Sequence, residues 1–326
     1  MRNKSASRTR AGILFSIALA VVLLPAYAGP FWQYLLANVF LLAVFALSFN
    51  LLFGMTGFLS FGHAAFFAIG AYVSGGSLLA GYPLGVAIAA GTLAAGAAAA
   101  VIGFFCIRHT KVYFSLLTLA FGMMVHAIVW KWTVVTGGDD GLVGIPRGTF
   151  GVPDVAALSL KGLPGIYVLI TLLSLAAIAI LHRIHHSPFG LVLNGIRENY
   201  GRVDFAGIDA RRTLLKAFLL AGTFAGLAGS MMAPLENTVS PSVAHWTKSA
   251  EPVMATLIGG PYTFFGPAIG AAVFIGLKEV IVRFTEHWLL IFGIVLMVIV
   301  LGFRGGIAGF IADHWRSRRS GGGAHE

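Results

Sequence analysis

A short polar stretch interrupts the apolar sequence between residues 50 and 72. Glycine permits backbone conformations that end a helix, and hydroxyl and imidazole groups can hydrogen-bond a polar molecule. Unpaired backbone groups at membrane depth are tolerated only where they are buried in protein or line a water-filled cavity. We therefore predict an element that lines a path for a polar solute, formed by Gly54, Gly57, Ser60, Gly62 and His63. Close helix contact through small residues is the alternative for the glycines, and a hydrogen-bonded structural role is the alternative for His63.

A similar interruption, GGPYTFFGP, occurs within the apolar region 250–283. The sequences FGHA (residues 61–64) and FGPA (residues 265–268) both follow a glycine-containing interruption, and both precede a Gly-Ala pair. Corresponding broken segments in two halves of a membrane protein indicate a transport path. The pattern therefore predicts two broken segments in one bundle.

The sequence contains no recognisable catalytic or metal-binding motif. It lacks G-x-x-x-x-G-K-[ST], H-E-x-x-H and G-x-S-x-G, and its single cysteine, Cys106, excludes an intrachain disulfide. We expect no catalytic residue, metal or cofactor in this chain, so its energy source must be an ion gradient or a partner. Gradient-driven carriers usually place carboxylates within their apolar segments. None of the acids near apolar segments is in mid-segment, which weakens that alternative; they are Glu236, Glu251, Glu279 and Glu286.

A basic segment, residues 187–212, differs from an ordinary hydrophilic connector. Ser187-Pro188 is a helix start signal, and a short helix is predicted from about Gly190 to Tyr200. Its apolar residues, Leu191, Leu193 and Ile196, alternate with Asn194, Arg197 and Glu198. Such an amphipathic helix suits docking into a groove on a soluble partner, with binding to anionic lipid headgroups as the alternative. The preceding histidines, His182, His185 and His186, are expected only to add positive charge.

The elements that must position these residues are membrane-spanning helices. The chain is 58% hydrophobic and 10% charged, with a mean hydropathy of +0.87. Continuous apolar runs favour helices over a β-barrel, whose strands alternate. We predict an all-α polytopic transmembrane bundle with about 9–10 crossings and broken helices. The candidate spans are 11–28, 35–53, 64–81, 83–106, 112–130, 163–181, 213–233 and 287–303, with a half-helix at 250–260 and a return over 267–283.

The distribution of positive charge predicts the orientation of the chain. Sixteen of the 22 Lys and Arg residues lie in four stretches: the N-terminus, residues 108–111, residues 182–216 and the C-terminal tail. By the positive-inside rule these stretches, including both termini, are cytoplasmic, and the loop 133–162 lies outside. A cleavable signal peptide ending near Ala28 is the alternative for the N-terminus. The net charge of +10 comes without a basic-aromatic motif, so no nucleic acid partner is expected.

Four stretches together resemble the LivM-type permease subunits of branched-chain amino-acid ABC importers. They are residues 50–72, TGGDDGLVGIP (136–146), residues 187–233 and residues 246–271, and they cover most of the chain in the family's order. The resemblance implies one permease domain, residues 1–326, in a bacterial inner membrane. It also implies a second, LivH-like permease, two cytoplasmic ATPases that bind ATP, and a periplasmic solute-binding protein.

The resemblance also assigns roles to residues in this chain. The segment 187–212 would couple to the ATPases, and the loop 133–162 would be periplasmic. The ATPase-docking residues would be Gly190, Asn194, Arg197, Glu198, Asn199 and Gly207. The path would include the residues of the first interruption and, in the second, Gly259, Gly260, Gly266 and Pro267.

Two departures from the family pattern concern the substrate. Tyr200, Gly201 and Arg202 follow the Arg-Glu-Asn sequence where the family often has an acidic residue and alanines, and Tyr262 and Phe264 replace small residues around Thr263. Branched-chain amino acids are the expected substrate. Urea, short amides or aromatic acids are alternatives, as are a self-sufficient gradient-driven carrier and a membrane assembly protein that transports nothing.

Overall fold

The computed structural model describes residues 29–109, 111–147, 149–150, 158–159, 162–285, 287–302 and 305–309. Predictions about the span 11–28, the signal peptide and the C-terminal charge cluster beyond residue 309 lie outside these residues. The helices in chain order are α2 (Pro30–Thr56), α3 (His63–Leu79), α4 (Leu84–Cys106), α5 (Lys111–Lys131), α6 (Thr133–Thr136), α7 (Leu163–His185), α8 (Pro188–Glu198), α9 (Tyr200–Phe205), α10 (Ala210–Glu236), the 3-10 helix η1 (Pro241–Ala244), α11 (Trp246–Gly259), α12 (Gly266–Phe284) and α13 (Trp288–Gly302).

The all-α membrane fold is confirmed. Within the described ranges, five helices are long and apolar enough to cross a membrane: α2, α4, α5, α7 and α10. Helix α3 is apolar but shorter, with 17 residues. A crossing needs about 20 residues of helix, so α3 and the 14-residue α11 are shorter than a full span. The total number of crossings stays a prediction.

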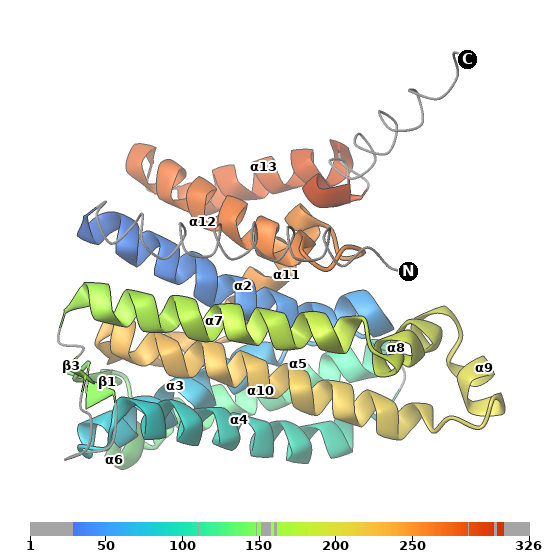
Figure 1. Ribbon diagram of the computed structural model, residues 1–326, viewed down its shortest axis with the longest axis horizontal. Helices are drawn as coiled ribbons and strands as arrows, with labels where there is room; N and C mark the ends of the chain where they lie inside the picture. The colour runs from blue at the N-terminus through green and yellow to red at the C-terminus, as the bar shows by residue number, and fades with distance from the viewer. Residues whose placement is uncertain are drawn as a thin grey trace, which may run out of the picture.

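The long helices lie along one common direction, and the smaller elements lie at the two ends of the bundle (Figure 1). Helices α8 and α9 are at one end, and α6 lies at the opposite end with the short strands. Strand β1 (Leu142–Val143) pairs antiparallel with β4 (Thr238–Val239), and β2 (Thr149–Phe150) pairs antiparallel with β3 (Leu158–Ser159). The described residues of the predicted loop 133–162 are therefore at the end of the bundle opposite to the predicted docking segment.

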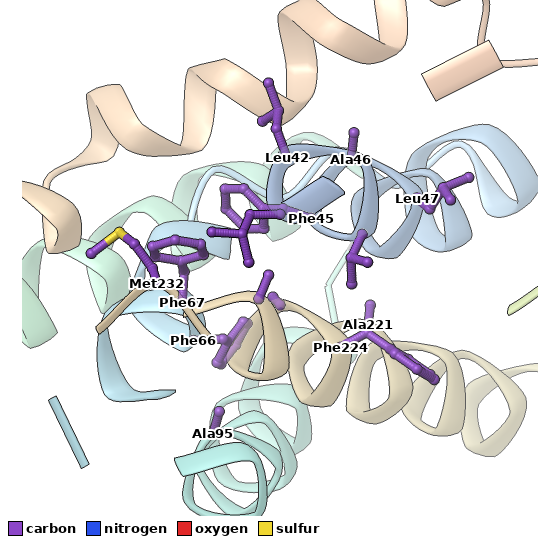
Figure 2. Packing of buried hydrophobic residues seen from close by; sticks show 14 of the residues in the cluster. Leu42, Phe45, Ala46, Leu47, Phe66, Phe67, Ala95, Ala221, Phe224 and Met232 are labelled. Carbon is purple, nitrogen blue, oxygen red and sulfur yellow. The ribbon is translucent and has the colours of Figure 1, made fainter. Parts of the chain in front are cut away.

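Small residues bring α3, α4 and α10 into close contact at the centre of the bundle. A side chain at Gly70 would collide with the backbone of Gly226, and one at Gly91 would collide with Ser230. Membrane helices associate closely through such residues because lipid provides no hydrophobic drive for association. Phe45, Phe66 and Phe67 fill the space between α2, α3 and α10, as Figure 2 shows.

Both predicted interruptions break a helix. The first break (residues 57–62) separates α2 from α3, and Gly57 ends α2 in the left-handed conformation, with φ 74°. The second break (residues 260–265) separates α11 from α12, and Gly260 has φ 104°. The predicted half-helix at 250–260 begins slightly earlier, at Trp246. The short helix predicted from about Gly190 is α8, followed by the separate helix α9.

Candidate functional site

The first break lies inside the bundle and not at its surface. After α2 ends at Thr56, the chain turns back, and the His63 ring lies 5.6 Å from the Phe49 ring and 6.0 Å from the Phe45 ring, between centroids. Phe49 is seven residues before the end of α2, about 10 Å along the helix axis. Helix α3 therefore begins within the bundle, which leaves the first break surrounded by protein.

Side chains from α5 and α11 hydrogen-bond the backbone of the first break. Ser115 Oγ donates to the Leu59 carbonyl at 2.6 Å, and the Phe61 N–H donates to Thr118 Oγ1 at 3.3 Å. At the start of α3, the Ala64 N–H donates to Ser249 Oγ at 2.8 Å. Irregular backbone inside a membrane bundle needs such partners, and here two other helices supply them.

Several polar side chains around this break are buried without a protein partner. Ser60 and His63 are fully buried, and neither Ser60 Oγ nor the two His63 ring nitrogens has a hydrogen-bond partner among the described residues. The same holds for Asn50 Oδ1 on α2 and Thr256 Oγ1 on α11. Buried polar groups are normally hydrogen-bonded. These atoms therefore give the interior beside the first break the capacity to hydrogen-bond a polar molecule.

The two breaks meet at one junction. A side chain at Gly54, in the last turn of α2, would collide with the Pro261 carbonyl in the second break. At the second break, Gly259 packs closely against the Gly266 backbone, and Gly260 packs against the Gly305 backbone. The predicted path residues other than Gly57 are buried. The path residues of the first break and those of the second break come together through the contact between Gly54 and Pro261.

Arg197 connects helix α8 to this junction. Its Nη1 atom donates a hydrogen bond to the Gly54 carbonyl at 2.8 Å, and its guanidinium carbon lies 4.3 Å from the centre of the Tyr262 ring. One side chain therefore contacts both broken helix pairs. The sequence analysis placed Arg197 at the docking surface, whereas its side chain is half-buried and directed toward the membrane helices.

The predicted docking segment forms two helices with well-defined starts. Ser187 caps α8 by accepting from the Gly190 N–H, and Asn199 caps α9 by accepting from the Arg202 N–H at 3.0 Å. Gly190 is buried against the backbone of His185, and Gly207, with φ 82°, follows the C-cap residue of α9. Partial burial raises the pKa of the Tyr200 phenol at the start of α9.

A groove runs between α8 and α9. It has a volume of about 340 Å³, and Leu191, Val203 and Ile208 contribute to its apolar part while Glu198 and Arg202 contribute charge. Phe205 beside it is 95% exposed. Leu193 and Ile196, expected to contact a partner, are instead buried against this chain. Asn194, Glu198 and Asn199 are exposed, as docking requires.

Sequence reasoning missed two groups of residues. His182, His185 and His186 do more than add charge, because their rings contact Phe264 in the second break, at 5.0, 5.4 and 6.5 Å between centroids.

The second group is an ion pair inside the bundle. The sequence analysis places none of the acidic residues in the middle of an apolar segment, but Glu251 lies within helix α11. Its carboxylate pairs with the Lys248 ammonium at 2.7 Å, and both side chains are about one quarter exposed. The Lys-x-x-Glu spacing, which places both residues on one helix face, was the available signal.

Apolar helices, two broken helix pairs and a polar interior junction define a polytopic helical membrane protein. The chain belongs to the family described as branched-chain amino acid transport system / permease component, which matches residues 32–301.

Individual relatives agree with the family. The chain is 29% identical to the high-affinity branched-chain amino acid transport system permease protein LivM of Escherichia coli (strain K12), over 78% of this chain and 65% of that protein. It is 28% identical to LivM of Salmonella typhimurium over the same shares, and 22% identical to LivH of Escherichia coli (strain K12) over 73% of this chain and 80% of that protein. The chain thus spans about two thirds of the length of the LivM relatives. No solved structure matches it.

Proposed function

We propose that this chain is a transmembrane permease subunit of an ATP-driven importer for branched-chain amino acids. Membership of the permease family and the names of its relatives support this function. The contact of Arg197 with both Gly54 and Tyr262 is the observation that carries the mechanism, because it links an exposed helix pair to the junction of two broken helices.

The proposed complex contains partners at both ends of the bundle. Residues 187–212 form the cytoplasmic ATPase-coupling segment, and two ATPase subunits bind and hydrolyse ATP, since this chain has no P-loop. At the opposite end, residues 133–162 are periplasmic and receive a solute-binding protein. A LivH-like permease completes the path. The complex lies in a bacterial inner membrane with both termini of this chain cytoplasmic, and residues 1–326 form one permease domain.

The mechanism follows from the contacts that lead from the α8–α9 groove through Arg197 to the junction of the two breaks. An ATPase engages the groove between α8 and α9 and shifts α8 when ATP binds. Arg197 transmits this shift to the Gly54 carbonyl and the Tyr262 ring, so the junction of the two breaks moves with α8. Such a junction changes shape more readily than a continuous helix because its backbone is not held by i to i−4 hydrogen bonds. The movement opens the path alternately to the two sides.

Co-purification and transport test this proposal together. The chain is isolated gently from its native membranes after crosslinking, and its partners are identified by mass spectrometry. Two P-loop ATPases, a second permease and ATP-dependent leucine uptake in reconstituted vesicles are expected. A chain that purifies alone and transports under an ion gradient would establish the secondary carrier instead. Uptake of urea, short amides or aromatic acids, but not leucine, would retain the importer and replace its substrate.

A further inference from the structure

Helices α4 and α10 pack side by side in opposite directions. Three glycines of α4 each pack against a residue of α10, in the reverse order along the chain: Gly91 against Ser230, Gly96 against Thr223 and Gly103 against Phe218. Each step along α4 therefore corresponds to close to one step back along α10. Figure 1 shows the two helices side by side, with the C-terminal end of α4 and the N-terminal end of α10 toward α8 and α9.

This pairing places three cations at the end of the two helices that lies toward α8 and α9. Arg108 is five residues beyond Gly103, so it is level with a residue about five before Phe218. Arg212, in the first turn of α10, occupies this level. Lys216 is about 6 Å further along α10 and is level with the last turn of α4. The three cations therefore lie within about one helical turn of each other along the bundle.

The α4 side of this region is apolar and exposed, with a cation at its end. Gly96 faces Thr223 of α10. Ala100 and Phe104 follow Gly96 at four-residue steps, so they lie on the same side of α4. Ala100 is exposed, and the Phe104 ring is 51% exposed. The Arg108 guanidinium carbon lies 4.3 Å from the centre of the Phe104 ring, and this cation–π contact holds the charge beside α4.

The α10 side carries the other two cations. Lys216 and Arg212 precede Thr223 by seven and eleven residues, spacings that return to the same face of a helix. Leu219, on the same side, is 36% exposed. Arg212 pairs with Asp209 at 3.0 Å, and both side chains are at least half exposed. An exposed pair of this kind contributes little to stability, so stability alone does not account for the cations.

We propose that an anionic phospholipid binds this surface, which we call the α4–α10 flank. The flank consists of Ala100, Phe104, Arg108, Arg212, Lys216 and Leu219. The lipid phosphate lies between the three cations, and an acyl chain lies along Phe104 and Leu219. Charge complementarity identifies this occupant, because basic pockets between membrane helices bind phosphate head groups.

Two further observations favour a lipid over a soluble anion. Both α4 and α10 are long and apolar enough to cross a membrane, so the exposed surface between their ends lies at the level of the bilayer. Lys216 lies within α10 and not in a connecting loop, where the positive-inside rule counts charge. Its apolar stem covers the helix surface while its ammonium reaches the phosphate level. A free anion would contact the cations and leave Phe104 and Leu219 uncovered.

Lipid binding to the purified full chain tests this inference. The chain is delipidated in detergent and titrated with anionic phosphatidylglycerol or zwitterionic phosphatidylethanolamine, and bound lipid is counted by native mass spectrometry. Each Lys or Arg near an anionic lipid contributes about a fivefold change in binding. We therefore expect Arg108→Gln and Lys216→Gln each to lower the affinity for phosphatidylglycerol about fivefold. The affinity for phosphatidylethanolamine should not change.

Three variants control this measurement. Arg108→Lys and Lys216→Arg keep the charge and should keep the original affinity. Arg183→Gln removes an exposed cation from α7 at the same end of the bundle and should leave the affinity unchanged. An equal loss in Arg183→Gln and in the two flank variants would show a general effect of surface charge and overturn the inference. Unchanged affinity in both flank variants would overturn it too. Melting temperatures in lipid-free detergent establish that each variant is folded.

Competition experiments identify the occupant of the flank. Inorganic phosphate should not displace phosphatidylglycerol, and full displacement would assign the cations to a soluble anion instead. The ATPases that co-purify with the chain should leave the bound lipid in place. Loss of the lipid on their addition would show that a protein covers the flank, which would overturn the inference.

The inference requires only that α4 and α10 cross a membrane, so it goes beyond the proposed function. Selective binding of phosphatidylglycerol at the flank of a chain that transports no solute would contradict the proposed function alone. ATP-driven leucine uptake by a chain that binds both lipids equally would contradict the inference alone.

Discussion

The Arg197 guanidinium donates a hydrogen bond to the Gly54 carbonyl at 2.8 Å, across 143 residues of sequence. Gly54 lies in the last turn of α2, where the carbonyl groups of a helix lack partners within the helix. Arg197 satisfies one of them and at the same time covers the Tyr262 ring. Helix α8 is thereby attached to the moving parts of the proposed path and does not merely lie on the membrane surface.

Removal of this contact is expected to uncouple ATP hydrolysis from transport. A hydrogen bond to a charged group contributes about 1.5–3 kcal/mol, so Arg197→Met should lower uptake roughly ten- to hundredfold while ATPase activity persists. Uptake and ATPase activity are measured on the same reconstituted complex. Arg283→Met, which removes an exposed charge from α12 outside the α8–α9 groove, is the matched control. Equal losses of both activities in Arg197→Met would contradict a transmitting role.

Charge reversal separates docking from transmission. Glu198 is exposed beside the groove, whereas Arg197 is half-buried. We expect Glu198→Lys to weaken ATPase binding without changing the stability of the isolated chain, and Arg197→Glu to lower both. Thermal unfolding in detergent and ATPase pull-down distinguish the two variants. Normal uptake in both would remove the docking assignment from this segment.

The exposed apolar side chains at the α8–α9 end should determine ATPase affinity. Phe205 is 95% exposed and Leu191 is 71% exposed. Because an apolar side chain buried at an interface contributes about 1.5–3 kcal/mol, Phe205→Ser should weaken ATPase association roughly tenfold or more. Val134→Ser changes a 93% exposed residue at the opposite end and should leave association unchanged. Binding is measured with purified ATPase and the chain in nanodiscs.

Close contact at the junction makes Gly54 sensitive to substitution. An added methyl group would collide with Asn50 and with the Pro261 carbonyl, so Gly54→Ala should destabilise the chain by about 1–3 kcal/mol. Gly76→Ala on α3 meets no atom within 4 Å and should be neutral or slightly stabilising. The free energies of unfolding of the two variants are measured in detergent and compared. Equal stability of the two variants would show that the junction relaxes without cost.

The hydrogen bond between α3 and α11 offers a test of the first break. Ser249→Ala leaves the buried Ala64 N–H without its partner and should cost about 1–3 kcal/mol. Ser77→Ala removes a bond to the Val73 carbonyl within one helix and should cost much less, since that carbonyl already belongs to the helix. Amide hydrogen exchange at residues 63–67 should increase in Ser249→Ala and not in Ser77→Ala.

Local sequence patterns predicted the helices and both breaks. Apolar runs of about 20 residues and glycine-rich interruptions act within a few residues of their own position, so the ends of α2 at Thr56 and of α11 at Gly259 could be anticipated. The start of α8 followed from Ser187-Pro188 for the same reason. The resemblance of four stretches to a permease family likewise needed only their order along the chain.

By itself, therefore, the sequence determined that this is a helical membrane protein with two broken helix pairs and an amphipathic connecting helix. Only the tertiary structure decided that Gly54 meets Pro261, that Arg197 turns inward to both, and that Lys248, Glu251 and Lys278 share one cavity. Contacts between residues far apart in sequence depend on how whole helices are arranged. That arrangement follows from the combined fit of many small residues across α2, α3, α4 and α10, which no single stretch of sequence contains.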